Sequence, residues 1–191
     1  MTARDLAQRL RDQFGPEITG PFEFRGEVTV EARDAQRIVE ICTFARQTLE
    51  LDYLVDLCGM DDWGQTPRFV LVYRLYSYAH RAALRLKTRL DGDPPELPTV
   101  TVVWPGANWL EREVFDLLGV RFRGHPDLRR ILMWDGYPYY PMRRDFPLAG
   151  LPSDAPGVAF SRVAPEEGGP FVAIPGGQDA TDREPRSQES P

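Results

Sequence analysis

Apolar residues recur at helical spacing in two stretches of the first 50 residues, and each stretch predicts a helix. The first begins at a capping box formed by Thr2 and Asp5, and Asp34 is suited to cap the second. Cys42 lies on the apolar face of the second helix, so we interpret it as a core residue. The apolar positions are Leu6, Leu10 and Phe14 in the first helix, and Ile38, Ile41, Cys42, Ala45 and Leu49 in the second.

Alternation of apolar and polar residues, or short apolar runs, predicts strands over 22–24, 28–30, 53–57, 69–73, 84–90 and 100–104. Residues 58–64 are predicted to form a turn, and 93–98 a proline-rich connector. Hairpin-like neighbours without a repeated βαβ unit favour an α+β fold. We therefore expect a small mixed or antiparallel sheet packed with helices, followed by an extended irregular C-terminal segment.

Three basic residues, Arg85, Lys87 and Arg89, alternate with leucines in the strand over 84–90. This is the period of a half-exposed strand. The simplest interpretation is a solvated face, and the alternative is a docking surface for an acidic partner.

The chain divides into three parts: an α+β domain (1–120), an irregular docking segment rich in arginine and aromatic residues (121–150) and a Pro/Gly-rich acidic tail (151–191). The tail holds seven prolines and five glycines, and offers little apolar area to offset its ordering entropy. We expect it to be partly disordered in the isolated chain. Residues 158–160 and 171–174 are predicted to dock on a partner.

Composition excludes several functions. The formal charge of -6 argues against binding of nucleic acid or an anionic membrane surface. Two cysteines are too few for a disulfide framework and suit a reducing compartment. We expect no signal peptide and no direct membrane span, because no apolar run approaches about 18 residues. The sequence also lacks a dinucleotide-binding glycine motif and a phosphate-binding loop, so no cofactor is expected in this chain.

A short amphipathic helix is predicted from Asn108 to Gly119. Asn108 is suited to cap it, with Glu111 turning back to the Asn108 amide. At about 100° per residue, the polar positions and one large aromatic residue share the outward face. Because tryptophan and arginine are enriched in buried protein contacts, this face is predicted to bind a partner. Its members are Trp109, Arg112, Glu113 and Asp116.

A metal-dependent enzyme is the alternative of a different class. Glu113 and Asp116 lie one helical turn apart and His125 follows closely, and such a set could ligate a metal or perform acid–base chemistry. However, Pro126 is suited to the first position of a helical turn, where His125 would cap or hydrogen-bond.

The segment after this helix interleaves arginines with aromatic residues and prolines. Acidic residues at 127, 135 and 145 are mixed in, which argues against nucleic acid and favours contact with another protein. Guanidinium groups paired with carboxylates would fix the register of such a contact. The arginines are Arg121, Arg123, Arg129, Arg130, Arg143 and Arg144.

The region from Glu111 to Leu132 resembles a known signature. It reads Glu111-Arg112-Glu113, two residues, Asp116-Leu117-Leu118, six residues, His125, three residues, Arg129, one residue, Ile131-Leu132. The signature is that of the 30-kDa-type peripheral-arm subunit of respiratory complex I, NADH:quinone oxidoreductase. The resemblance extends through residues 104–109 and 142–148 and covers roughly residues 1–150. One departure is Tyr140, where the family commonly has the histidine of a second Gly-His-Pro.

The resemblance implies a cofactor-free structural subunit of the hydrophilic arm, peripheral to the inner membrane of a bacterial cell on its cytoplasmic side. NADH, FMN, iron-sulfur clusters and quinone would be bound by partner subunits, and the complex couples electron transfer to proton translocation. The expected partners are the quinone-pocket subunit and the iron-sulfur subunits. A related membrane-bound hydrogenase-type complex is the alternative within the family.

No catalytic residue is expected in this chain. The predicted partner interface comprises Trp109, Arg112, Glu113, Asp116, His125, Arg129, Arg130, Arg143, Arg144 and Asp145.

Overall fold

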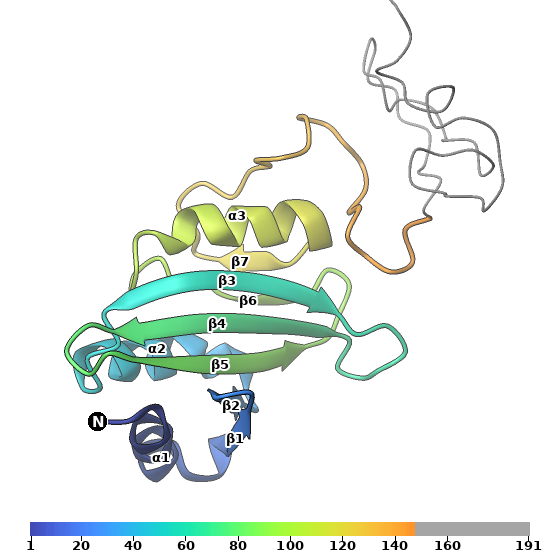
Figure 1. Cartoon of the computed structure of the whole chain (residues 1–191). Helices are drawn as coiled ribbons and strands as arrows, with labels where there is room; N and C mark the ends of the chain where they lie inside the picture. The colour runs from blue at the N-terminus through green and yellow to red at the C-terminus, as the bar shows by residue number, and fades with distance from the viewer. Residues whose placement is uncertain (148–191) are drawn as a thin grey trace, which may run out of the picture. The chain divides into compact units, whose positions relative to one another are not determined.

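The computed structural model describes residues 1–147, so the predicted docking of 158–160 and 171–174 lies outside the described residues. Met1–Arg144 form one compact unit, and the remaining described residues belong to a second unit. The first unit contains a five-stranded sheet with strand order β1-β2-β5-β4-β3 (Figure 1). Its strands are β1 (Ile18–Phe24), β2 (Glu27–Ala32), β3 (Tyr53–Asp61), β4 (Phe69–Ser77) and β5 (Ala82–Leu90).

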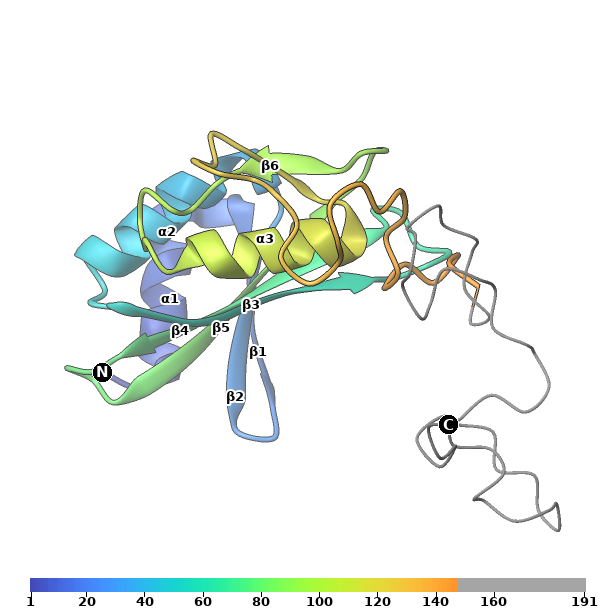
Figure 2. The same cartoon turned by 90° about the horizontal axis from the view of Figure 1, so that it is seen from above.

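The sheet is mixed, because β2 pairs with β5 in parallel and all other neighbours are antiparallel. The prediction of an α+β fold with a mixed sheet is confirmed. Strands β1 and β2 join through Arg25 and Gly26, whose φ angles of 51° and 78° are both positive. This is the backbone of a two-residue turn matched to the twist of a hairpin. The hairpin extends away from α2 and α3 (Figure 2).

The first helix begins as the sequence predicts, but the predicted Asp34 cap of the second helix is displaced, because the N-cap residue of that helix is Arg37 and no side chain caps it. Helix α1 (Ala3–Phe14) starts at Thr2, whose hydroxyl accepts the Asp5 N–H while the Asp5 carboxylate accepts the Thr2 N–H. Asp34 accepts the N–H of Gln36 at 2.8 Å. It thereby caps a single 3-10 turn, η2 (Ala35–Arg37), which leads into α2 (Ile38–Gln47).

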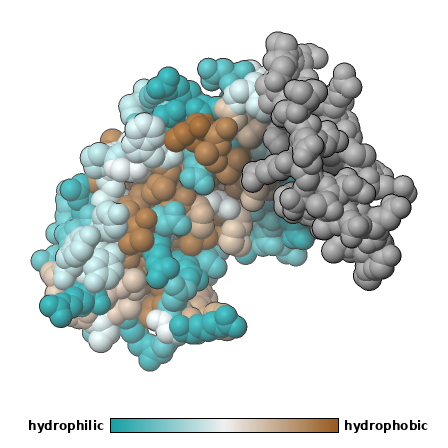
Figure 3. Space-filling view, turned by 45° about the horizontal axis from the view of Figure 1, so that its top comes forward, coloured by the Kyte–Doolittle hydropathy of each residue, from teal (hydrophilic) through white to brown (hydrophobic). Residues whose placement is uncertain are grey.

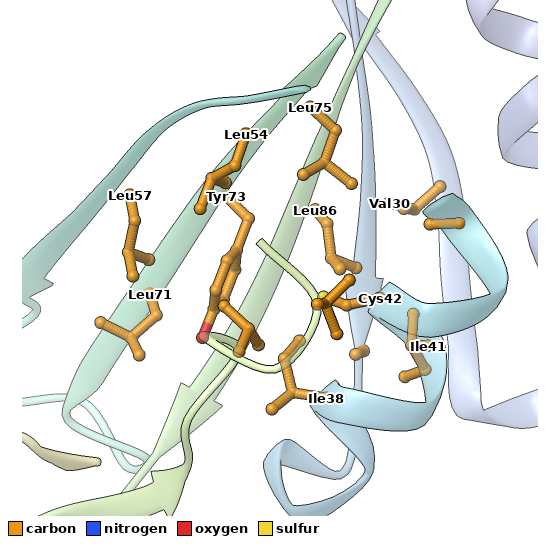
Figure 4. Close-up of a cluster of buried hydrophobic side chains, with 14 of the residues drawn as sticks. Val30, Ile38, Ile41, Cys42, Leu54, Leu57, Leu71, Tyr73, Leu75 and Leu86 are labelled. Carbon is orange, nitrogen blue, oxygen red and sulfur yellow. The ribbon is translucent and has the colours of Figure 1, made fainter. Parts of the chain in front are cut away.

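The core lies on one face of the sheet, where the strand register aligns apolar residues in rows. One row consists of Val30, Leu86, Tyr73 and Leu57. Helix α2 packs against this face with Ile38, Ile41 and Cys42, all at most 1% exposed (Figure 4). Cys42 is therefore a core residue, as predicted, and burial raises the pKa of its thiol.

The opposite face of the sheet carries Arg85, Lys87 and Arg89, as the alternation predicts. Two of these charges are balanced within the chain. Arg85 forms an ion pair with Glu27, and Arg89 lies 3.3 Å from Glu31. This internal pairing favours a solvated face over a docking surface for an acidic partner.

The turn predicted to begin at Cys58 and the strand predicted over 100–104 are both wrong. Strand β3 continues to Asp61 instead of turning at Cys58, because it stays paired with β4 along its whole length. Residues 100–104 form turns, since the N–H groups of Val103 and Trp104 both bond to the Val100 carbonyl. The strand instead falls in the proline-rich connector, as β6 (Glu96–Pro98). It pairs in parallel with β7 (Arg121–Arg123), so the segment predicted to be irregular begins with a short strand.

Helix α3 (Ala107–Leu118) packs against β3. Gly59 of β3 makes this approach possible, because a Cβ there would overlap Leu118 and lie 3.2 Å from Val114 Cγ1. The helix ends at Gly119, whose φ of 78° is the left-handed conformation that the sequence predicts for this stop. Among residues 1–147, no helix is long and apolar enough to cross a membrane.

Candidate protein-docking surface

Glu111 is fully buried rather than turned back to cap the helix. The predicted Asn108 cap is wrong: the N-cap residue is Gly106, and no side chain caps the helix. Glu111 instead accepts the Val100 N–H at 2.7 Å and contacts the Thr99 hydroxyl. Burial raises the pKa of its carboxyl to about 7, against the opposing effect of these hydrogen bonds. The Glu111 carboxylate therefore bonds to the 99–104 turn, and not to the Asn108 amide at the N-terminus of the helix as predicted.

The His125 side chain is buried beside Glu111, with Nε2 3.9 Å from the carboxylate. Its Nδ1 accepts the Asp127 N–H at 3.0 Å, which leaves Nε2–H to donate to the Asn108 carbonyl at 3.1 Å. These two bonds define a neutral imidazole with its proton on Nε2. The interpretation of His125 as a hydrogen-bonding turn residue is confirmed.

Arg112 is 6% exposed and does not share an outward face with its neighbours. Its guanidinium donates to the carbonyls of Arg129 at 3.1 Å and Arg130 at 3.0 Å. It also lies 5.1 Å from the ring centroid of Trp109, which is itself 61% exposed. Arg112 thus ties the backbone of the following segment to α3 and supports an exposed aromatic ring.

Asp116 is fully buried and is the most heavily bonded carboxylate of this region. Its Oδ2 accepts three consecutive N–H groups, those of Ile131 at 3.0 Å, Leu132 at 2.7 Å and Met133 at 2.8 Å. Its Oδ1 lies 2.6 Å from the Arg130 guanidinium. Burial raises the pKa of the Asp116 carboxyl, but these hydrogen bonds outweigh burial, and the pKa lies below its ordinary value.

The end of the segment is tied to the C-terminus of α3. The Arg143 guanidinium donates to the Leu118 carbonyl at 2.7 Å. The Tyr140 ring lies between two cations, 4.7 Å from Arg143 and 5.2 Å from Arg130. A Cβ at Gly119 would overlap this ring, so the glycine also provides room for Tyr140. The Tyr140 ring thus contacts two arginines that are bonded to α3.

The structure thus divides the predicted interface residues into two groups. Trp109 and Glu113 are exposed, as predicted. The predicted outward position is wrong for Arg112 and Asp116, because the chain's own 129–133 backbone covers them.

The remaining predicted interface residues follow the same division. Arg130, Arg143 and His125 serve internal contacts. Arg129 is exposed and pairs with Asp127, and the Arg144 side chain is exposed. Asp145 is also exposed, and it begins the second unit.

The three residues of the metal-site alternative do not converge. Asp116 is occupied by Arg130 and three N–H groups, Glu113 is exposed, and His125 lies beside Glu111. Within residues 1–147, no group of three or more His, Cys, Asp or Glu side chains is placed to hold a metal.

The face that carries α3 and the following segment also gathers apolar side chains, which appear brown among hydrophilic ones (Figure 3). The apolar share of this surface was missed from the sequence, although the run Ile131-Leu132-Met133 between charged residues was a usable signal. The exposed large apolar residues of these elements are Trp109, Ile131, Leu132 and Met142.

The fold and this surface define an α+β domain that holds a long irregular segment against one helix through side-chain to backbone hydrogen bonds. Residues 31–152 match the family model of the respiratory-chain NADH dehydrogenase 30 Kd subunit, and the chain belongs to this family.

Curated relatives agree with the family match. The chain is 48% identical over 143 residues to the C subunit, designated 2, of the NADH-quinone oxidoreductase of Rhizobium etli, an alignment that covers 74% of this chain and 75% of the relative. It is 46% identical over 143 residues to the C subunit of the same oxidoreductase from Geobacter sulfurreducens, covering 74% and 88%.

Solved structures share the fold. The trypsin-resistant fragment (1-134) of Nqo5 aligns with a TM-score of 0.56 and 30% identity, covering 65% of this chain and 98% of the fragment. The membrane-bound sulfane sulfur reductase, an archaeal respiratory complex, contains a chain that aligns with a TM-score of 0.66. Its 22% identity, over 76% of this chain and 85% of that one, supports the common fold alone.

Proposed function

We propose that this chain is a structural subunit of the hydrophilic arm of NADH:quinone oxidoreductase. The observation that carries this function is the family match over residues 31–152, together with relatives at 46–48% identity that are named as the C subunit of this oxidoreductase. The complex would oxidise NADH and reduce quinone with coupled proton translocation, and this chain would support that chemistry without a catalytic residue of its own.

The redox groups would be held by partner subunits: NADH, FMN, iron-sulfur clusters and quinone. The placement of the two cysteines supports this. Cys42 lies in the core, whereas Cys58 is exposed on β3 and pairs in register with Val72. Because a biological iron-sulfur cluster is held by four protein ligands, thiolates with or without histidines, two cysteines so placed do not form such a set.

The partners we propose are the quinone-pocket subunit and the iron-sulfur subunits, contacted through the surface of α3 and the segment up to Arg144. Trp109 and Glu113 would contact the partner directly. Arg112, Asp116, Arg130 and Arg143 would act by holding the segment in place. The first three bond to its backbone, and Arg143 donates from the segment to the Leu118 carbonyl of α3. Arg129 and Arg144 complete the exposed polar part of this surface. Asp145, which begins the second unit, would contact the partner separately.

We further propose a peripheral location on the cytoplasmic side of the inner membrane. Washing membranes at alkaline pH should release the chain into the supernatant. Added protease should digest it in inverted vesicles but spare it in intact spheroplasts. Retention after the wash, or digestion in spheroplasts, would contradict this location.

The function is tested by capture of an affinity-tagged chain that replaces the chromosomal copy in the source cells. The captured fraction from detergent-solubilised membranes should oxidise NADH with a quinone analogue as acceptor, and should contain flavin and iron-sulfur clusters. A tagged chain that is abundant but recovered without this activity would overturn the proposal. Hydrogenase activity without NADH oxidation would instead indicate the related hydrogenase-type complex.

A further inference from the structure

The loop at 129–133 combines an apolar surface with an unusually polar support. The side chains of Leu132 and Ile131 are 61% and 37% exposed. Their backbone N–H groups nevertheless bond to the carboxylate of Asp116, which is 0% exposed. The carbonyls just before them are held by Arg112, which is also buried.

The hydrogen bonds of Asp116 outweigh the desolvation cost of its buried carboxylate, since they hold its pKa below the ordinary value. The network also gives the loop a fixed shape, because three consecutive N–H groups converge on one oxygen. A fixed shape matters for binding, because a preorganised loop avoids the ordering cost of association.

Other exposed apolar residues along α3 are also held by nearby bonds. Three large apolar side chains are each 61% exposed, those of Trp109, Leu132 and Met142. Each lies near a point where the segment, or the Arg112 side chain that supports it, is held against the helix. Trp109 stacks with Arg112, and the Met142 N–H bonds to the Leu117 carbonyl at 3.1 Å. We call these three exposed side chains of α3 and the segment bonded to it the apolar strip. Figure 3 shows apolar side chains gathered on the face that carries these elements.

Charge indicates what kind of surface covers this strip. No carboxylate among the described residues forms an ion pair with Arg112 or Arg144. The Arg112 guanidinium has only carbonyls and an aromatic ring as partners, and the Arg144 side chain is exposed. Because Arg112 is buried, the exposed Arg144 is the cation that a partner's carboxylates can reach, so a complementary surface places carboxylates beside an apolar groove. The net charge of -6 does not favour an anionic lipid surface in this place.

We propose that the 129–133 loop is a preformed apolar knob, with Leu132 at its tip and Asp116 as its positioning residue. It inserts into a hydrophobic groove of a partner subunit that carries carboxylates facing Arg144. This inference rests on the proposed function, since the partner is another subunit of the oxidoreductase.

The first experiment compares two exposed apolar residues in the tagged full-length chain expressed in its own cells. Leu132→Ser should lower recovery of the complex on the order of tenfold, as loss of an interface anchor does. The thermal unfolding midpoint of the purified chain should not change. Phe24→Ser is the matched control, because Phe24 is 70% exposed on the β1–β2 hairpin. It should leave recovery unchanged.

The second experiment tests positioning by Asp116. Asp116→Asn should accelerate amide hydrogen exchange at Ile131, Leu132 and Met133 and lower recovery of the complex. If Asp116 acts through the knob, the double variant with Leu132→Ser should assemble no worse than Leu132→Ser alone. Additive losses would show that Asp116 acts elsewhere, and would overturn its assigned role.

The outcomes separate the knob from the proposed function. If the wild-type chain recovers active complex and Leu132→Ser does so equally well, the knob is wrong and the function stands. If the wild-type chain recovers no such complex, both are wrong. Self-association of the purified chain in light scattering, lost in Leu132→Ser, would assign the strip to a second copy and overturn the proposed partner.

Discussion

The Glu111 carboxylate accepts the Val100 N–H at 2.7 Å in a fully buried site, so a titratable group of α3 holds the turn that follows β6. Its hydrogen-bond partners, the Val100 N–H and the Thr99 hydroxyl, are both uncharged. Burial therefore raises the pKa of Glu111 from 4.5 to about 7. The folded chain binds this proton more tightly than the unfolded chain does.

Stability should consequently fall as pH rises through the interval from 4.5 to about 7, and level off above it. Over the whole interval the loss from Glu111 amounts to about 3 kcal/mol. Glu111→Gln should remove this component, since an amide keeps the shape and the acceptor oxygen without the charge. Denaturant unfolding of both proteins between pH 5 and 8 measures the difference.

The expected signature is a difference that depends on pH. The free energy of unfolding of Glu111→Gln should increase relative to that of the wild type as pH rises. At pH 8 the variant should be the more stable protein. Glu113→Gln is the control, because Glu113 is the exposed glutamate of the same helix, and it should follow the wild type throughout. Parallel curves for Glu111→Gln and the wild type would show that Glu111 does not titrate in this interval.

Gly59 sets the distance between β3 and α3. Gly59→Ala should cost roughly 1–3 kcal/mol, because its Cβ would overlap Leu118 and force the helix outward. Gly106→Ala should change stability by about 0.5 kcal/mol or less, since nothing lies within 4 Å of a Cβ there. Urea unfolding of both variants checks the pair. Equal effects would mean that the helix adapts to the added methyl group.

The regular elements of the domain were predictable because local patterns determine them. The Thr2 capping box, the apolar face around Cys42 and the left-handed stop at Gly119 each depend on neighbours in the sequence. The parallel pairing of β6 with β7 was not predictable in this way. It joins Glu96 to Arg121 across a helix, and the proline-rich stretch carries no alternation.

The predicted outward face of α3 is right for Trp109 and Glu113 but wrong for Arg112 and Asp116. Helical periodicity placed Asp116 and Arg112 opposite the apolar face, and this geometry is right for an isolated helix. It could not reveal that the 129–133 backbone covers that side. The polar face of α3 is therefore partly internal, and side chains that resembled contact residues bond to the chain's own carbonyl and N–H groups.

Because His125 is hydrogen-bonded within the chain, a metal-binding measurement is a decisive test of the metal-site alternative. Both ring nitrogens are hydrogen-bonded within the chain, to Asn108 and Asp127. After incubation with zinc or manganese and desalting, the purified full-length chain should carry no metal in stoichiometric amount by elemental analysis. His125→Gln should leave this result unchanged. Stoichiometric metal in the wild type, lost in the variant, would favour the enzyme.

Arg112 and Glu113 are adjacent in sequence and opposite in role, which gives the sharpest test of the surface. Arg112→Glu should destabilise the domain by roughly 2–3 kcal/mol, because two backbone carbonyls lose a charged donor and a carboxylate is buried in its place. Glu113→Lys should change stability by no more than about 0.5 kcal/mol, since its side chain is exposed.

Denaturant unfolding of the purified chains measures both values, and recovery of the complex from cells gives the second readout. Glu113→Lys should then impair assembly without loss of stability, whereas Arg112→Glu should impair both. Normal assembly with Glu113→Lys would remove Glu113 from the docking surface, and an undiminished stability of Arg112→Glu would show that its carbonyl contacts do not hold the segment.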